Sequence, residues 1–251
     1  MAGHSKWANI KRHKAKVDAV KGQIFAKMSR AIMVAARNGI PDPEGNFQLR
    51  TAIEKAKAAG IPNENIERAI AKGAGMAGGD NLESIRYEGY GPGGVAIIIE
   101  ALTDNRNRTA ADIRAAFNKY GGNLGETGCV SWLFSHRGVV TVKHTMTEEE
   151  ILAACLEGGA DTYEYTTWEE EPVVEIFTAI PNLEHLNRYL QSLGWSILQT
   201  EFRWIPSNTV AVTDSEQARS LLKLIDALDN LEDVQTVTTN FDMAEELLAL
   251  A

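Results

Sequence analysis

The first regular hydrophobic pattern in the chain is helical and begins at Gly22. Its apolar positions recur at the spacing of one helix face: Ile24, Phe25, Met28, Ile32 and Ala35. The same spacing predicts a second helix over residues 46–59 and a third over residues 63–72. Three short amphipathic helices in succession predict a small helical domain over residues 21–72.

After a glycine-rich stretch at residues 73–80, the pattern becomes that of strands. Residues 83–102 are strand-like on both sides of Gly91-Pro92-Gly93, which predicts a β-hairpin. A helix capped at Thr103-Asp104 follows, and residues 129–134 predict another strand. This segment therefore begins a separate domain that contains a sheet.

The C-terminal segment has the elements that this sheet needs. Residues 209–212 predict a short strand. Thr213 and Glu216 form a capping box that opens a helix ending at Leu228. A last strand at residues 234–241 could complete the sheet begun by the hairpin.

Between these segments, the predicted order is strand, helix, strand, strand, helix, strand. Thr147 and Glu150 form a capping box, which predicts the start of the first of these helices. The order is that of the split-βαβ, ferredoxin-like motif. The expected elements are strands at residues 138–144, 161–166, 173–178 and 195–204 and helices at residues 147–156 and 181–194.

These patterns predict an α+β multidomain protein: an N-terminal three-helix domain and two α+β domains, one of them ferredoxin-like (βαββαβ) and inserted in the other. Four glycines between residues 73 and 80 offer little side chain to bury and give high backbone freedom, as in a linker. The predicted segments are a basic arm at residues 1–20, the helical domain at 21–72, the linker at 73–80, a middle α+β domain at 81–135 plus 207–251, and the inserted domain at 136–206.

The charges are segregated along the chain. The first 37 residues hold nine Lys or Arg residues and one acid, and residues 1–72 hold 14 basic and six acidic residues. The remaining 179 residues hold 11 basic and 28 acidic residues, and the net charge of the whole chain is −9. A basic end on an acidic body is attracted to a polyanion that repels the body. Nucleic acids favour such contacts strongly, because each neutralised phosphate releases counterions.

A basic cluster at residues 11–16 follows an aromatic residue, Trp7. Basic side chains contact phosphates and Trp stacks on bases, whereas the alternative is a solvated tail. The helix after Gly22 extends the positive charge onto a structured surface, which favours phosphate contact. A membrane surface ranks lower, because the apolar face is needed to hold the three helices together. The predicted nucleic-acid contacts in this region are Lys6, Trp7, Lys11, Arg12, His13, Lys14, Lys16, Lys21, Lys27, Arg30 and Arg37.

Arg106 and Arg108 stand at the start of a predicted helix, where cations oppose the helix macrodipole by roughly 0.3–1 kcal/mol. Helix stability therefore does not explain them. One interpretation pairs them with Asp104, Asp112 or another acid. The other makes them a second phosphate contact aided by free helix N–H groups. Both stay open, and both arginines are counted among the predicted nucleic-acid contacts.

Other chemistry finds little support in the sequence. Residues 89–94 match G-x-G-x-x-G, but a strand follows them where a dinucleotide site requires a helix, so we interpret them as a turn. No catalytic triad can be argued, and the histidines lack metal-ligand spacing. We expect no metal, no cofactor and no enzymatic activity. The histidines are His4, His13, His136, His144 and His185.

The expected compartment is the cytoplasm. Cys129 and Cys155 form no CxxC pair and suggest no disulfide framework, which fits a reducing environment. The chain has no run of 18 apolar residues and no apolar segment at its N-terminus. A membrane span and a secretory signal are therefore not expected.

Three strings of residues resemble the YebC/PmpR family, which includes the mitochondrial translational activator of cytochrome c oxidase. They are AGHSKWANIK at residues 2–11, GYGPGG at residues 89–94 and TDNRNRT at residues 103–109, and the resemblance covers almost the whole chain. It implies three domains, with one α+β domain inserted in the other, and a non-enzymatic cytosolic protein. Bacterial members are described as DNA-binding transcriptional regulators, while others look like ribosome-associated translation factors.

The sequence favours a nucleic-acid-binding regulator of gene expression that grips phosphates through its basic N-terminal region. An alternative is a ribosome-associated translation factor that binds ribosomal RNA with the same arm. In both, the acidic domains set the orientation or engage protein partners. A remote alternative is a small-ligand sensor or enzyme in the cleft between the two α+β domains. No base-reading motif is visible in the sequence.

Overall fold

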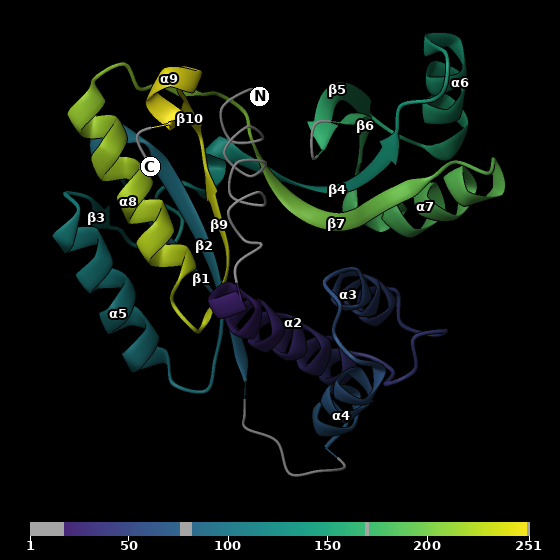
Figure 1. The fold of residues 1–251 in the computed structure, drawn as a ribbon, viewed down its shortest axis with the longest axis horizontal. Helices are drawn as coiled ribbons and strands as arrows, with labels where there is room; N and C mark the ends of the chain where they lie inside the picture. The colour runs from purple at the N-terminus through teal and green to yellow at the C-terminus, as the bar shows by residue number, and fades with distance from the viewer. Residues whose placement is uncertain (1–17, 76–81, 169–170, 250–251) are drawn as a thin grey trace. The chain divides into compact units, whose positions relative to one another are not determined.

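The computed structural model describes residues 18–75, 82–168 and 171–249. The described chain forms two compact units. The first holds the described residues up to Leu133 and from Pro206 onward, and the second holds those between Phe134 and Ile205. Three N-terminal helices followed by segments that contain sheets confirm the predicted α+β class (Figure 1).

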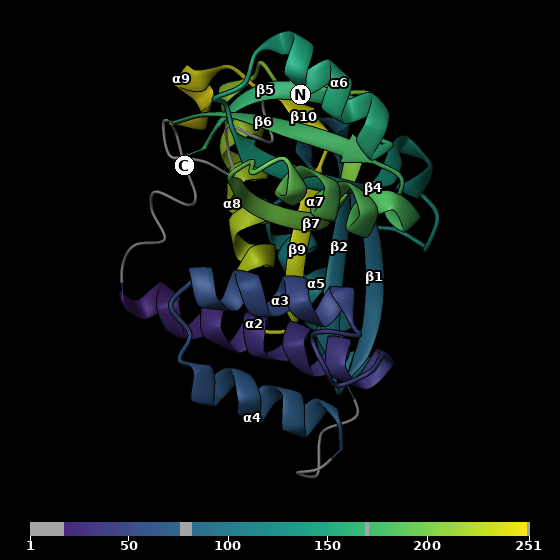
Figure 2. The ribbon, with the colours of Figure 1, turned by 90° about the vertical axis from the view of Figure 1, so that its right-hand side faces the viewer.

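Three helices open the first unit: α2 (Asp18–Asn38), α3 (Phe47–Ala58) and α4 (Asn63–Gly73). They lie side by side, with α2 in the middle (Figure 2). Their apolar faces meet in one core around Ile32, Leu49 and Ala56, each 0% exposed. The helix predicted from Gly22 begins four residues earlier, and the three-helix prediction is confirmed.

Most of the predicted arm and linker lies outside the described residues. Residues 1–17 of the arm and 76–80 of the linker belong to the part that is not described. Residues 18–20 begin α2, and Gly73 is the last residue of α4.

The same unit contains a four-stranded sheet in the order β3-β1-β2-β9. Its strands are β1 (Glu83–Tyr90), β2 (Ala96–Thr103), β3 (Asn123–Leu124) and β9 (Val234–Thr239). β1 and β2 form the predicted antiparallel hairpin, and β9 pairs with β2, so the C-terminal segment does complete the sheet. Helices α5 (Arg106–Lys119) and α8 (Ser215–Asp229) lie together on one side of the sheet (Figure 1).

The chain end of this unit adds a small second sheet. Strand β8 (Val210–Ala211) pairs in parallel with β10 (Phe241–Asp242), and helix α9 (Glu245–Leu248) follows. The strand predicted at residues 234–241 is therefore divided between two sheets.

Two predictions within this unit are wrong in detail. Of the strand expected at residues 129–134, only Phe134 lies in a strand, as the first residue of β4 (Phe134–Lys143); residues 129–130 form a bend and Ser131–Leu133 a 3-10 helix. The Glu88 carboxylate accepts the backbone N–H groups of Val130 and Ser131, which are therefore not available to a strand partner. The helix caps also shift. Asn105 caps α5 and Asp214 caps α8, in place of the residues named from the sequence.

The second unit has the predicted ferredoxin-like order of elements. These are β4 (Phe134–Lys143), α6 (Glu148–Gly158), β5 (Thr162–Trp168), β6 (Glu171–Thr178), α7 (Leu183–Ser192) and β7 (Ile197–Pro206). Its sheet has the order β5-β6-β4-β7, in which β6 is antiparallel to both β4 and β5. The Thr147–Glu150 capping box is present at the start of α6, as predicted.

Candidate nucleic-acid interface

The predicted nucleic-acid contacts fall into two groups in the structure. Lys27, Arg30 and Arg37 lie on α2, and Arg106 and Arg108 lie in the first turn of α5. Lys21 also belongs to α2, but its side chain is not among those described. Seven further residues lie outside the described part of the chain: Lys6, Trp7, Lys11, Arg12, His13, Lys14 and Lys16.

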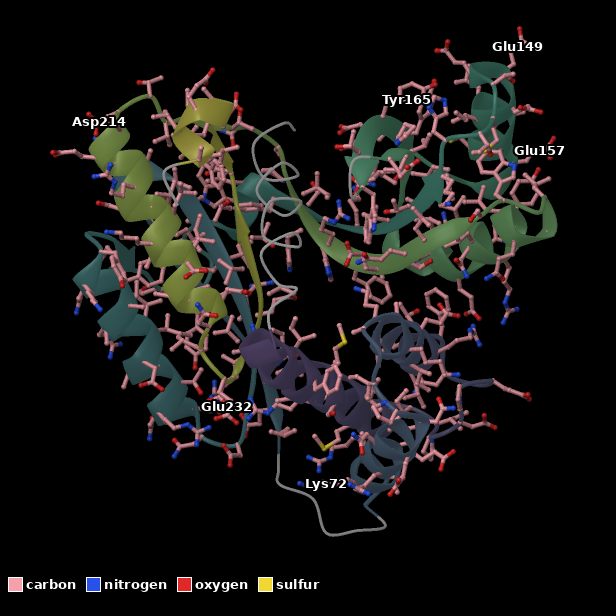
Figure 3. All side chains as sticks on the ribbon, viewed as in Figure 1. Lys72, Glu149, Glu157, Tyr165, Asp214 and Glu232 are labelled. Atoms are coloured by element: carbon pink, nitrogen blue, oxygen red, sulfur yellow. The ribbon has the colours of Figure 1, made fainter. Side chains whose placement is uncertain are left out.

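Two cations of α2 face acids from the C-terminal part of the same unit. These acids are Asp229, Glu232 and Asp233, which we call the acidic corner. The acidic corner lies where the chain passes from the end of α8 to β9, and Glu232 is labelled in Figure 3. Lys27 lies 3.4 Å from a carboxylate oxygen of Asp229 and also donates to the Asp229 carbonyl. The side chains of α2 that the sequence predicts to contact phosphates thus contact carboxylates of the same unit.

Arg30 makes the more extensive contact with the acidic corner. Its guanidinium donates to the Glu232 carboxylate, to the Glu232 carbonyl at 2.5 Å and to the Asp233 carboxylate at 3.2 Å. The Arg30 side chain is 16% exposed, whereas that of Glu232 is 78% exposed. Lys27 and Arg30 are three residues apart and therefore share one face of α2.

Asp233 is the centre of this network. Its second carboxylate oxygen accepts hydrogen bonds from Arg108 at 2.8 Å, Thr109 at 2.7 Å and Thr103 at 3.2 Å. Burial alone raises the pKa of Asp233, but the hydrogen bonds from Arg108 and Thr109, the charge of Arg108 and the hydrogen bond from Thr103 together lower it. Asp233 is therefore ionised at neutral pH and compensates cations from two helices.

The arginines at the start of α5 also have acidic neighbours. Arg108 pairs with Asp104 and with Asp233, each at 2.8 Å, and these contacts raise its pKa. Arg106 lies 3.7 Å from Glu83, and its side chain is 69% exposed. The acid-pairing interpretation thus describes both arginines in this structure, with Arg106 the more open to solvent.

The acidic corner was not identified from the sequence. Its acids are close in sequence and resemble an ordinary solvated turn, and their partners lie about 200 residues earlier. Only the excess of cations on α2 hinted that acids elsewhere in the chain would meet them.

The structure also bears on the dinucleotide site, the metal site and the membrane span that the sequence led us not to expect. The G-x-G-x-x-G string contains the connection between β1 and β2, including a 3-10 turn (Pro92–Gly94), and β2 follows it. Within the described residues, no group of three or more His, Cys, Asp or Glu side chains could hold a metal ion. The same part of the chain has no helix long and apolar enough to cross a membrane.

Comparison with known proteins gives matches over both parts of the chain. A family model described as the N-terminal domain of TACO1/YebC proteins matches residues 5–76, and one described as the TACO1/YebC second and third domain matches residues 82–241. A "probable transcriptional regulatory protein" of Gloeothece citriformis is 69% identical, and the match covers 100% of this chain and 99% of that relative. One from Nostoc punctiforme with the same description is 67% identical, with the same coverage.

A solved structure is also similar. The crystal structure of a conserved hypothetical protein from Aquifex aeolicus matches with a TM-score of 0.81 and 47% sequence identity. The match covers 92% of this chain and 94% of that one.

Proposed function

The chain belongs to the TACO1/YebC family, and on that basis we propose that it is a non-enzymatic, nucleic-acid-binding regulator of gene expression. Its basic N-terminal region contacts phosphates, and its primary role is that of a DNA-binding transcriptional regulator. The names of its relatives support this role, since they are those of regulatory proteins. The protein acts in the cytoplasm.

The observation that carries the proposal is the segregation of charge. Residues 1–72 have 14 basic and six acidic residues, whereas residues 134–205 have four basic and 12 acidic residues. A polyanion attracts the first region and repels the second, so productive contact is local and oriented. Glu149 and Glu157, on α6, illustrate the acidic surface of the second unit (Figure 3). That surface repels nucleic acid and suits protein partners with basic surfaces.

The contacts of α2 support an anion-binding role for this helix. Lys27 and Arg30 already bind carboxylates, and their side chains are 17% and 16% exposed, respectively. A phosphate, like a carboxylate, is an anion whose oxygens accept hydrogen bonds from cationic side chains. Nucleic acid that reaches α2 therefore competes with the acidic corner, while the arm, at residues 1–20, makes the first contact.

A second candidate function is that of a ribosome-associated translation factor that binds ribosomal RNA. The acidic composition of the second unit favours it, because residues 134–205, with four basic and 12 acidic residues, are repelled by a duplex but can face protein partners on a ribonucleoprotein. Folded RNA presents a shaped surface on which a basic helical domain and acidic, partner-facing domains can both be used. The small-ligand sensor and the enzyme gain no support from the described residues.

The arm is tested by replacing Lys11, Arg12, Lys14 and Lys16 with Ala and titrating the protein with duplex DNA at several salt concentrations. The log–log salt slope should fall by roughly 0.7–0.9 for each phosphate that the variant no longer neutralises. The folding of the protein should not change, because in the sequence these residues precede the first regular hydrophobic pattern, which begins at Gly22. An unchanged affinity and slope would remove the arm from the mechanism.

The two candidate functions are separated by comparing promoter DNA with ribosomes. A cell lysate is fractionated on a sucrose gradient with and without RNase, and promoter and scrambled duplexes are titrated at about 0.15 M salt. A promoter preference of roughly 10³ or more, with no protein in the ribosomal fractions, establishes the transcriptional function. Sedimentation with ribosomes that RNase abolishes, together with weak promoter preference, establishes the translational one.

A further inference from the structure

One face of β1 carries a cation, a buried acid and an aromatic residue in alternating positions. Gly89 faces α5, since a Cβ on it would meet the Phe117 ring at 2.8 Å. Side chains alternate along a strand, so Arg86, Glu88 and Tyr90 lie on the opposite face, away from α5. This second face is where the β1 side chains meet the loop at residues 125–133.

Glu88 fixes that loop. Its carboxylate accepts the backbone N–H groups of Val130 and Ser131, each at 2.9 Å, and also binds Arg86 at 3.1 Å. The Glu88 side chain is 0% exposed. Burial alone raises the pKa of Glu88, but the backbone hydrogen bonds and the nearby Arg86 lower it overall. A buried, compensated charge therefore holds the loop in one conformation.

The loop presents an aromatic side chain to solvent. The indole N–H of Trp132 and the hydroxyl of Tyr90 both donate to the carbonyl of Cys129, at 3.0 and 3.1 Å. Nevertheless Trp132 is 72% exposed and Tyr90 is 37% exposed. Their polar atoms are already satisfied within the protein, so what they offer to a partner is the flat apolar face of each ring.

We propose that Trp132 and Tyr90 form a stacking site for unpaired bases of a single-stranded nucleic acid. Every base has a π-face and needs no hydrogen bond to stack on an aromatic ring. On the same strand face, Arg86 is paired with the buried Glu88, and its side chain is 36% exposed. Sheet faces that carry aromatic residues are a common way to bind single-stranded RNA.

Other occupants fit this surface less well. A membrane surface fits less well, because interfacial membrane binding uses an amphipathic helix with an extended apolar face, whereas this loop contains only a 3-10 turn, Ser131–Leu133. A protein partner commonly uses the hydrogen-bonding atoms of Trp and Tyr as well as their rings, and here those atoms are occupied. The inference rests on the proposed function and narrows it: the target contains unpaired bases, as folded RNA or an opened duplex does.

The test compares the wild-type protein with the Trp132→Ala variant in titrations of labelled oligouridine and oligothymidine 12-mers and of a duplex, at several salt concentrations. Affinity for the single strands should fall roughly 5- to 140-fold, the range typical for loss of one stacked base. The salt slope should not change, because no phosphate contact is removed. Binding to duplex should be unaffected.

Two further variants make the result specific. Trp132→Phe should keep most of the affinity, whereas Trp132→Leu, which keeps apolar bulk but has no π-face, should behave like Trp132→Ala. Leu156→Ala is the matched control, since Leu156 is 82% exposed in the second unit and its removal should change nothing. Thermal melting of each variant shows whether the fold is intact, as the exposure of Trp132 leads us to expect.

Each alternative outcome is decisive. If the wild type binds nucleic acid and Trp132→Ala binds the single strands equally well, the stacking site is wrong and the proposed function stands. Equal losses for duplex and single strands, or a binding-competent Trp132→Leu variant, also overturn stacking. If the wild type binds no nucleic acid at all, both proposals fail.

Discussion

Arg30 and Arg108, from two different helices, bind the same carboxylate. Arg30 lies 3.2 Å from one oxygen of Asp233, and Arg108 lies 2.8 Å from the other. Cations that the sequence assigns to two separate phosphate contacts are thus joined through one acid. A change at the acidic corner should therefore affect the anion affinity of α2 and the stability of the unit in ways that can be measured separately.

The first prediction concerns competition between the acidic corner and nucleic acid. Replacing Asp229 with Asn and Glu232 with Gln removes two carboxylates that face Lys27 and Arg30 and leaves Asp233 in place. Affinity for nucleic acid should rise, and the log–log salt slope should steepen by up to roughly 0.9 for each cation released. The measurement is a titration of duplex DNA and ribosomal RNA over a salt series.

A charge-matched control separates this effect from a general one. Glu149→Gln with Glu171→Gln makes the same change in net charge at exposed positions of the second unit. It should raise affinity only slightly and leave the salt slope as in the wild type. If both double variants behave alike, the acidic corner has no specific role and only net charge matters.

The second prediction concerns stability and compares neighbouring acids. Asp233→Asn leaves Arg30 and Arg108 without their shared charge and disturbs the hydrogen bonds from Thr103 and Thr109. We expect it to lower the free energy of unfolding by about 1–3 kcal/mol. Glu232→Gln should cost less than about 1 kcal/mol, because the Glu232 side chain is 78% exposed. Urea unfolding measures both, and equal losses would show that Asp233 is not the centre of the network.

These acids also show what the sequence could not reveal. The periodicity of α2 and the Thr147–Glu150 capping box are local signals, carried by residues within a few positions of one another, and both predictions succeeded. The contact of Arg30 with Glu232 joins residues 202 positions apart, and no local pattern encodes it. The prediction of a strand at residues 129–134 failed for the same reason. The Glu88 carboxylate, 42 positions earlier in the chain, accepts the hydrogen bond of the Val130 N–H group.

The third prediction concerns acid stability. The pKa values of Glu88 and Asp233 are lowered in the folded protein. A folded pKa below the unfolded value means that the ionised group stabilises the fold above the unfolded pKa, and that this contribution is lost as the pH falls through the folded pKa. The unfolded values are about 4.3 for Glu and 3.9 for Asp. Wild-type stability should therefore fall as the pH drops below about 4.

Glu88→Gln isolates one part of this dependence. At pH 7 it should lower the free energy of unfolding by about 1–3 kcal/mol, because two backbone N–H groups lose a charged acceptor. The difference from the wild type should shrink as the pH falls and disappear once Glu88 is protonated. Urea unfolding at a series of pH values tests this, and a constant difference across the series would contradict it.

The last prediction uses two helical glycines with opposite surroundings. A Cβ on Gly22, in α2, would meet nothing within 4 Å. Alanine is favoured over glycine in a helix, so Gly22→Ala should stabilise the protein by about 0.5–1 kcal/mol.

A Cβ on Gly73, at the end of α4, would instead collide with the Met33 carbonyl oxygen and lie 2.9 Å from the Ala36 Cβ. Gly73→Ala should therefore push α4 away from α2 and destabilise the protein by about 1–3 kcal/mol. Thermal or urea unfolding of the two variants gives the signs directly. Stabilisation by Gly73→Ala would mean that α2 and α4 are not in close contact, and would remove the packing on which the three-helix domain depends.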